Sequence, residues 1–532
     1  MSSKFSLRLA LSVLSGFLLF ASFPFLNWHW FVWVATLPLL LALVCERSLR
    51  RAFLLGYISG FIFLGGSCYW FVYVMRRYGG MGWLLAIGVL VLFLIVFSVF
   101  FGAFGLVEGF IAQRSPEFAL LAAPFLWVAM EVARTYLITG FPWNLLGYAV
   151  DDGGLRQIAS VTAVYGLSFL AVSISALAAW WLFDARNPFR AMGFATAIVG
   201  LFVVNLLVSP VPMFPEHGSY AFLVQPNIPL DETKLEEWIP WKNPKNLNDL
   251  VAATDRVACQ GTAFAVSATP PDCSSSSERP FTPALVVWPE NPAPFYFDRD
   301  QVFREALESV AKHTGDYTIS GTTLFDANGR PRNSAVVLDP SGNLILAYDK
   351  IHLVPFGEYV PWWAFPKLVG KITFEAGDFA PGTEYKVAQT PQGGIGVFIC
   401  YESIFPQLVR KLTDRGAGVL VNISDDGWFG SSSAGEQHLE MARLRAIENH
   451  RYLLRATNDG ITAIIDPHGE IVSSMPRNQP GVLTGRFGYI TGTTFYTRHG
   501  DVFAWTCVAI TAILLLVVEV QKKRVRGEVA SG

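Results

Sequence analysis

The sequence is poor in charged residues. Asp, Glu, Lys and Arg make up 15% of the 532 residues, whereas soluble domains contain about 25% of them. Hydrophobic residues make up 52%, which excludes an intrinsically disordered chain and argues against an enzyme that is soluble throughout. The formal net charge is −2, so the chain lacks the positive excess that nucleic-acid-binding proteins carry.

Residues and motifs that hold cofactors are also scarce. Six cysteines are too few for a disulfide-built scaffold in a chain of this length. The eight histidines show no metal-ligand spacing, and neither a GxGxxG nor a Walker pattern occurs. The sequence therefore predicts no metal and no nucleotide cofactor.

The hydrophobic residues are gathered in long runs without charge. Residues 9–45, for example, contain no Asp, Glu, Lys or Arg, and a helix needs about 20 apolar residues to cross a bilayer. Buried helices of a soluble protein do not use runs of this length, so we expect eight transmembrane helices. The predicted spans are residues 8–25, 28–45, 53–75, 82–110, 117–138, 162–183, 190–209 and 502–520.

The distribution of Lys and Arg between the short loops predicts the orientation of these spans. Twelve Lys and Arg residues fall on one side and three on the other. Cytoplasmic loops carry the excess of positive residues, so we expect both termini in the cytoplasm and residues 210–501 outside it. The twelve are Lys4, Arg8, Arg47, Arg50, Arg51, Arg114, Arg186, Arg190, Lys522, Lys523, Arg524 and Arg526, and the three are Arg76, Arg77 and Arg156.

Charges return after residue 216, and short β-branched runs alternate with helical stretches there. This alternation predicts a layered α/β or α+β domain. We expect strands at 219–224, 284–288, 317–323, 334–338, 343–348, 394–399, 417–422, 461–466 and 482–486, and helices at 299–313, 402–413 and 434–455. The predicted domains are residues 1–212 with seven transmembrane helices, an outer domain at 216–495, an eighth transmembrane helix at 500–521 and a basic tail at 522–532.

Three potentially reactive side chains each follow a strand-like apolar run, where open sheets commonly place functional groups. They are Glu290, Lys350 and Cys400. A helix N-terminus after Cys400 and a nearby Lys would favour the thiolate, and Glu290 would accept the thiol proton. Spacing alone does not bring the three together, and such a cysteine is more often a small core residue.

The local strings are more specific than the spacing. Trp288-Pro289-Glu290-Asn291, the stretch 349–359 (DKIHLVPFGEY) and the stretch 400–403 (CYES) resemble the nitrilase, or carbon–nitrogen hydrolase, superfamily. The resemblance implies an αββα sandwich with a Glu–Lys–Cys triad. Glu290 would be the general base, Lys350 would stabilise the tetrahedral intermediate, Cys400 would be the nucleophile, and Glu358 would support the lysine.

Combined with the membrane segments, these strings resemble the apolipoprotein N-acyltransferase family. The stretches 224–229 (VQPNIP) and 139–143 (TGFPW) match strings of that family. The resemblance implies site roles for Tyr401 and Glu402 and an essential tryptophan, for which we choose Trp238 over Trp241.

The fold class implied is an α+β membrane protein with eight transmembrane helices and an extracytoplasmic nitrilase-like sandwich. The activity implied is transfer of a fatty acyl chain from a phospholipid, expected to be phosphatidylethanolamine, to the free α-amino group of a diacylated apolipoprotein, through a thioester on Cys400. We expect a monomer in the bacterial inner membrane with its catalytic domain in the periplasm. The alternatives are a membrane-bound nitrilase-type amidase or hydrolase and, in another class, a transporter or scaffold.

Two further expectations concern the outer domain. Its apolar loops would gate the site, with Trp362, Trp363 and Phe365 in one candidate loop and Trp428 and Phe429 in another. Cys259 and Cys273 would either form a disulfide or remain as two thiols.

Overall fold

The computed structural model describes residues 2–183, 196, 199–200, 218–228, 244–260, 283–292, 295–361 and 379–531. The chain divides into two compact units. A helical unit comprises Met1–Val72, Trp83–Pro210 and His499–Gly532. The second unit comprises Tyr73–Gly82 and Val211–Arg498, and we call it the catalytic unit because it contains the candidate residues Glu290, Lys350 and Cys400. The segment Tyr73–Gly82 therefore packs with the catalytic unit, although it is short and lies between two hydrophobic helices in the sequence.

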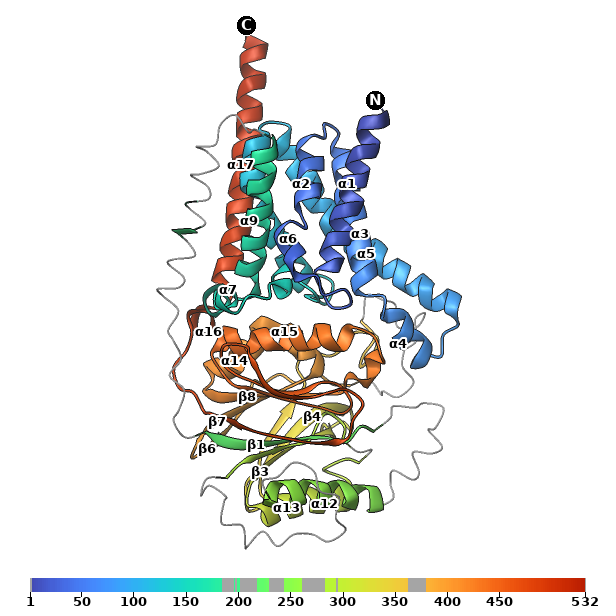
Figure 1. Cartoon of the computed structure of the whole chain (residues 1–532), viewed down its shortest axis with the longest axis vertical. Coiled ribbons are helices and arrows are strands. Elements are labelled where there is room, and N and C mark those ends of the chain that lie inside the picture. The colour runs from blue at the N-terminus through green and yellow to red at the C-terminus, as the bar shows by residue number, and fades with distance from the viewer. Residues whose placement is uncertain are drawn as a thin grey trace. The chain divides into compact units, whose positions relative to one another are not determined.

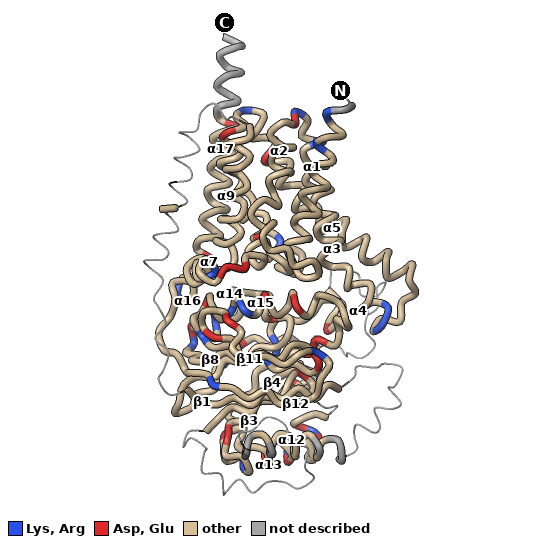
Figure 2. The backbone as a smooth tube through the Cα atoms, viewed as in Figure 1, with Lys and Arg blue, Asp and Glu red and all other residues tan. Residues whose placement is uncertain are grey.

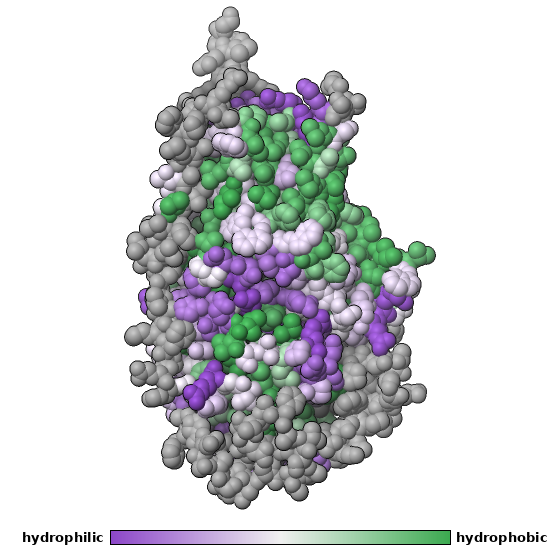
Figure 3. Space-filling view, viewed as in Figure 1, coloured by the Kyte–Doolittle hydropathy of each residue, from purple (hydrophilic) through white to green (hydrophobic). Residues whose placement is uncertain are grey.

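The helical unit contains, among its described residues, six helices that are long and apolar enough to cross a membrane. They are α1 (Ser2–Ala21), α3 (Leu49–Ser67), α5 (Trp83–Ala112), α6 (Pro116–Tyr136), α9 (Val164–Phe183) and α17 (Val502–Ser531). Apolar side chains cover most of the visible surface of this unit (Figure 3). These helices correspond to six of the eight predicted spans.

The other two predicted spans have different outcomes. The single helix predicted at 28–45 is wrong, because the chain forms the short 3₁₀ helix η1 (His29–Trp33) and then α2 (Leu37–Val44). Pro38 lies in the first turn of α2, and proline cannot continue a helix from the preceding turn. The span predicted at 190–209 lies almost entirely outside the described residues.

Close helix packing in this unit depends on glycine. A Cβ atom on Gly56 of α3 would lie 2.2 Å from the carbonyl oxygen of Phe101, and one on Gly105 of α5 would lie 2.4 Å from that of Ala52. Small residues allow helix backbones to approach each other in membranes, where van der Waals packing drives association. These glycines therefore fix the contact between α3 and α5.

Both chain termini lie at one end of the helical unit (Figure 1). Basic residues of its loops gather at that same end, while few charges occur along the helices (Figure 2). The C-terminal end of α3 and the N-terminal ends of α5 and α17 lead to the chain connections with the catalytic unit, at residues 72, 83 and 499. The three connections that fall among the described residues thus leave the helical unit at the end opposite to its termini, while the fourth, between residues 210 and 211, lies outside the described residues.

The catalytic unit is built on two six-stranded sheets. The first sheet contains β12 (Gly481–Phe487), β1 (Ser219–Gln225), β2 (Leu285–Val287), β3 (Tyr317–Phe325), β4 (Pro331–Leu338) and β5 (Leu344–Asp349), in that order. The second contains β11 (Ile471–Met475), β10 (Thr462–Ile465), β9 (Leu453–Thr457), β8 (Ala417–Ser424), β7 (Gly393–Ile399) and β6 (Val387–Thr390). In each sheet three neighbouring strands are parallel, namely β1–β2–β3 and β7–β8–β9, and the outer strands are antiparallel.

Helices cover the outer faces of both sheets within this unit (Figure 1). α12 (Pro244–Gln260) and α13 (Gln301–Thr314) lie on the first sheet, and α14 (Pro406–Asp414) and α15 (Ala434–Asn449) lie on the second. The inner faces share one hydrophobic core, to which Leu223, Val287, Ile319, Val397, Val421 and Leu454 belong. The predicted αββα sandwich is confirmed.

All nine predicted strands are present among the described residues, but three strands and one long helix were not predicted. These are β6, β9, β11 and α12. The helix predicted at 434–455 ends at Asn449, because His450 takes a left-handed conformation with φ of 47° and β9 begins at Leu453. The remaining short helices are α4 (Phe71–Arg77), η2 (Leu146–Ala149), α7 (Gly153–Arg156), α8 (Ala159–Thr162), η6 (Cys400–Ile404), η7 (Asp426–Phe429) and α16 (Phe495–His499).

Candidate active site

The three strand-following residues meet at the carboxyl ends of strands from both sheets. Glu290 comes three residues after β2, Lys350 directly after β5, and Cys400 directly after β7. A Cβ atom on Gly321 of β3 would lie 2.7 Å from the Cα of Glu290. The strand next to β2 therefore requires glycine where it passes the backbone of this carboxylate.

Lys350 lies between two carboxylates. Its Nζ is 2.9 Å from Glu358 Oε1 and 3.4 Å from Glu290 Oε1, and only 1% of its surface is exposed. Burial alone would lower the pKa of Lys350, but the charges of Glu290 and Glu358 outweigh burial and raise it. Lys350 is therefore a buried ammonium ion, as expected of a group that stabilises negative charge.

Asn333 completes this cluster, and sequence reasoning missed it. It lies in β4, and its Nδ2 donates to Glu290 Oε1 and to Glu358 Oε1, each at 2.7 Å. The backbone N–H of Asp425, directly after β8, donates to the other oxygen of Glu290 at 3.0 Å. These donors leave Glu290 in a fixed orientation. An asparagine inside a strand carries no sequence signal for such a role.

Cys400 has a buried thiol on a strained backbone. The residue is 8% exposed, and its φ of 48° lies in the left-handed region that residues other than glycine rarely adopt. Burial raises the pKa of the Cys400 thiol, the Glu290 carboxylate raises it further, and Lys350 opposes both. Lys350 therefore favours the thiolate, as predicted, but burial outweighs it, so the thiol keeps its proton until a base accepts it.

Glu402 ties the two sheets together. Its Oε1 accepts hydrogen bonds from the backbone N–H of Ile351 at 2.7 Å and from the Tyr348 hydroxyl at 2.9 Å, both on the first sheet's side. Its Oε2 accepts from the N–H of Ile399, at the end of β7, at 2.8 Å. Burial raises the pKa of Glu402 to about 7 despite these hydrogen bonds. Glu402 thus connects the residues that precede Cys400 with those that follow Lys350.

Tyr401 lies in an aromatic group beside the cysteine. Its ring is 5.3 Å from that of Phe405 and 5.8 Å from that of His352, measured between ring centroids. Of the other predicted residues, Trp238 and the alternative Trp241 lie outside the described residues. So do Trp362, Trp363, Phe365, the side chain of Cys259 and Cys273.

The loop after β8 is held by the segment Tyr73–Gly82. The hydroxyl of Tyr78 donates to the carbonyl oxygen of Gly427 at 2.8 Å, and its ring lies 4.5 Å from that of Trp428. A Cβ atom on Gly430 would lie 2.3 Å from the ring of Tyr73. Because the backbone N–H of Asp425 in the same loop donates to Glu290, this segment supports Glu290 indirectly.

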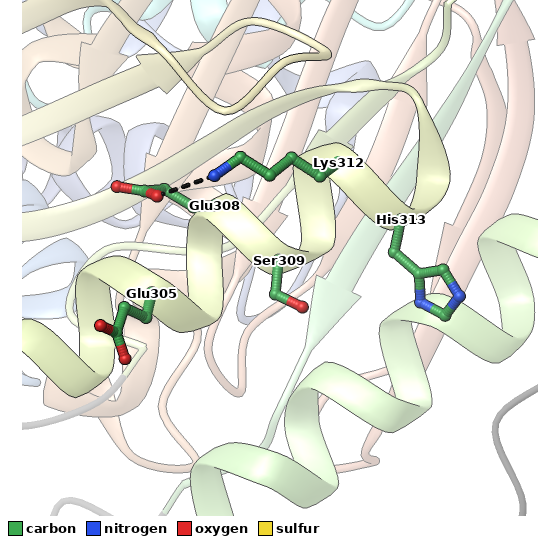
Figure 4. A pocket seen from close by; sticks show the side chains of 5 residues that line it. All are labelled: Glu305, Glu308, Ser309, Lys312 and His313. Carbon is green, nitrogen blue, oxygen red and sulfur yellow. Dashed lines mark hydrogen bonds and ion pairs between the residues drawn. The ribbon is translucent and has the colours of Figure 1, made fainter.

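Other places in the described chain offer less chemistry. A shallow surface hollow on α13 is lined by Glu305, Glu308, Ser309, Lys312 and His313 (Figure 4). All five side chains come from one helix, and Glu308 pairs with Lys312 at 3.0 Å. The described residues include no group of three or more His, Cys, Asp or Glu that could hold a metal ion.

Comparisons with known proteins cover both units. Residues 224–487 match the carbon–nitrogen hydrolase family model, and residues 15–177 match that of the apolipoprotein N-acyltransferase N-terminal domain. An apolipoprotein N-acyltransferase of Geobacter metallireducens is 38% identical over 95% of this chain and 94% of its own length. One of Methylococcus capsulatus is 32% identical over 92% of this chain and 91% of its own.

Among solved structures, an amidase from Nesterenkonia sp. aligns with 18% identity and a TM-score of 0.37, over 55% of this chain and 96% of the amidase. The family assignment rests on the sequence relatives, which align along nearly the whole chain and therefore include both the helical unit and the catalytic unit. The chain belongs to the apolipoprotein N-acyltransferase family.

Proposed function

We propose that this protein transfers a fatty acyl chain from a membrane phospholipid to the free α-amino group of an N-terminal diacylglyceryl-cysteine on apolipoproteins. The observation that carries the proposal is the buried cluster of Glu290, Lys350 and Glu358 beside the thiol of Cys400. The family membership names the acyl acceptor class, and this cluster supplies the groups that acyl transfer through a thioester requires.

In the first step Glu290 accepts the thiol proton, because burial keeps Cys400 protonated at rest. The thiolate attacks the carbonyl carbon of the phospholipid ester. Lys350 stabilises the negative charge on the carbonyl oxygen. The carbon–oxygen ester bond then breaks, the lysophospholipid alkoxide takes the proton from Glu290, and a thioester remains on Cys400.

In the second step the α-amine of the acceptor replaces the lysophospholipid. Glu290 accepts a proton from the attacking amine, the nitrogen bonds to the thioester carbonyl carbon, and Lys350 again stabilises the oxyanion. The carbon–sulfur bond breaks, the thiolate of Cys400 regains the proton, and the product is an amide. In this scheme Glu358 and Asn333 keep Lys350 and Glu290 in place, Glu402 and Tyr401 support the cysteine turn, and Trp238 contributes to substrate binding.

The helical unit explains how such substrates reach the cysteine. Each buried methylene of an acyl chain favours the bilayer by about 0.8 kcal/mol, so withdrawing two lipid substrates into water would be costly. We place the termini in the cytoplasm, because basic loop residues gather at that end of the helical unit. The catalytic unit then lies on the periplasmic side of the inner membrane, since its chain connections leave the opposite end. We further propose phosphatidylethanolamine as the donor and a monomer as the active form.

Product analysis tests this proposal against hydrolysis. Purified protein in phosphatidylethanolamine-containing detergent micelles is incubated with a diacylated lipopeptide that has a free N-terminal amine. We expect a third acyl chain, joined to the peptide by an amide, and no product with the Cys400→Ala variant. Release of free fatty acid without acylated peptide would instead support the membrane-bound hydrolase.

A further inference from the structure

A second polar network lies directly beneath the cysteine turn. Ser403 Oγ is 2.6 Å from His438 Nε2, and His438 Nδ1 is 3.0 Å from Asp426 Oδ1. The three side chains follow the order of a serine hydrolase triad. None of them has any exposed surface, so substrate cannot reach Ser403, and the network must act through its neighbours.

One of these neighbours is the backbone of the nucleophile. His438 Nε2 lies 3.1 Å from the carbonyl oxygen of Cys400. The left-handed backbone of Cys400 is strained and persists only where the surroundings hold it. His438, from α15, is the side chain that contacts the peptide group of Cys400 from the helix layer.

The other end of the network is anchored by a buried ion pair. Arg455 of β9 donates from Nη2 to Asp426 Oδ2 at 2.6 Å, and the same nitrogen is 3.1 Å from His438 Nδ1. Arg455 also donates to the side chain of Asn422 on β8. Burial would raise the pKa of Asp426, but Arg455 outweighs it and holds that pKa well below its usual range. Asp426 is therefore a carboxylate, and Arg455 Nη2 links it to Nδ1 of the imidazole, which leaves Nε2 as the nitrogen that can donate to the Cys400 carbonyl oxygen.

Two consecutive residues join this network to the base. Asp426 lies against His438 and shares Arg455 with it, and the backbone N–H of Asp425 donates to Glu290. The loop after β8 therefore contacts the general base on one side and, through His438, the nucleophile on the other. A displacement of this loop would move both reacting groups.

We propose that His438 is a positioning residue for the reaction: it holds the strained peptide of Cys400 and couples it, through Asp426 and Asp425, to Glu290. This inference rests on the proposed role of Cys400 as nucleophile. Misplacing a reacting group by about 1 Å can lower the rate about 100-fold. The loss of rate on disrupting the network should therefore be large enough to measure.

Two substitutions at position 438 separate positioning from simple filling of space. In His438→Gln the amide reaches the position of Nε2 and can still donate to the Cys400 carbonyl. In His438→Asn the shorter amide takes the position of Nδ1. It keeps the contact with Asp426 and loses the contact with the Cys400 carbonyl oxygen. His450→Asn is the matched control, because His450 is also buried but ends the same helix in a left-handed conformation.

The readout is the rate at which iodoacetamide alkylates Cys400, measured per folded molecule at constant pH, together with the single-turnover rate of acyl transfer. We expect both rates to fall about 100-fold in His438→Asn and about tenfold in His438→Gln, with KM nearly unchanged. His450→Asn should keep both rates. Thermal unfolding in detergent reports how much each variant loses in stability.

Equal rates in wild type and both variants, or a faster Asn than Gln variant, would overturn the inference. If His438→Asn does not fold, His438→Gln alone tests the inference. Cys400 alkylation in His438→Gln at the wild-type rate would then overturn it. Alkylation requires no lipid, so the role of His438 is tested even if the proposed acyl transfer fails.

Discussion

The two sheets of the catalytic unit contribute different chemistry to one site. The first sheet supplies two charged groups, Glu290 and Lys350, and their neutral partner Asn333. The second supplies a neutral, buried thiol at Cys400, on a backbone that is strained. The charged groups satisfy one another, whereas the thiol would depend on them for the proposed proton transfer. A reactive site therefore exists only where the two sheets are packed together.

Few contacts join the two halves of this site. Glu402 of the second sheet accepts from Ile351 of the first, and Asp425 of the second donates to Glu290 of the first. If each sheet contributes part of one site, removing a reacting group should abolish activity. Weakening one of the contacts between the sheets should cause a smaller loss of activity or stability. The variants below follow that order.

The largest effect is expected from Cys400→Ala, which removes the proposed carrier of the acyl chain. Acyl transfer should fall by about 10⁴-fold or more, as measured by formation of triacylated lipopeptide, while the protein still folds. Cys45→Ala is the control, since Cys45 is an exposed thiol of the helical unit. Activity of Cys400→Ala close to that of wild type would refute the assignment of the nucleophile.

Lys350→Met removes the cation of the first sheet and keeps most of its volume. Glu290 and Glu358 would then face each other without a positive partner, and the oxyanion would lose its donor. We expect single-turnover acylation to fall about 100–1,000-fold. Lys312→Met on α13, where the ion pair with Glu308 is exposed, should leave the rate unchanged. A similar loss in both variants would contradict a specific role for Lys350.

Glu402→Gln tests the tie between the sheets. The amide nitrogen of Gln would face N–H groups that need an acceptor, so at least one buried donor loses its hydrogen bond. An unsatisfied buried donor lowers stability by about 1–3 kcal/mol. The melting temperature in detergent should fall and activity should fall with it. Glu384→Gln, at an exposed glutamate, is the matched control.

Glu402 also predicts a pH dependence of stability. Its folded pKa of about 7 lies above the ordinary value of 4.5, so the folded state favours the protonated acid. The stability from this shift is complete below about pH 4.5 and is lost as the pH rises through about 7. The melting temperature of wild type should decrease from pH 5 to pH 8 by more than that of Glu402→Gln. Identical slopes would show that Glu402 does not titrate in this range.

The smallest effect is expected from Tyr78→Phe, which removes the hydroxyl contact with Gly427 and keeps the ring against Trp428. Loss of one neutral hydrogen bond, about 0.5–1.5 kcal/mol, should lower the rate of acyl transfer about two- to tenfold. Tyr57→Phe removes a similar bond to the carbonyl of Ile95 in the helical unit and should have no effect. Equal rates of acyl transfer in Tyr78→Phe and wild type would show that the segment Tyr73–Gly82 does not support Glu290.

The sequence predicts the reacting groups better than their supports. Glu290, Lys350 and Cys400 follow apolar strands in recognisable strings, so their places at the ends of β2, β5 and β7 could be predicted, while their chemical roles stay predictions. Asn333 and His438 carry no local signal, because their roles come from contacts between strands and helices that are far apart in the chain.

Long-range packing also explains the errors in the predicted fold. The strand β9 follows α15 after three residues, and its apolar side chains fit either type of structure until a neighbouring strand pairs with them. Similarly, nothing in Tyr73–Gly82 itself indicates that this segment packs with the catalytic unit. Burial likewise reverses the expected pKa of Cys400, because the sequence does not reveal how deeply a thiol is enclosed.

The most direct test of the account is mass spectrometry of the peptide that contains Cys400. Purified protein is incubated with phosphatidylethanolamine and no acceptor, so that the second step cannot occur. We predict one fatty acyl chain on Cys400, which hydroxylamine releases as expected for a thioester and which a diacylated lipopeptide removes as it becomes acylated. An unmodified Cys400 in protein that still forms product, or an acyl chain on another residue, would contradict the account.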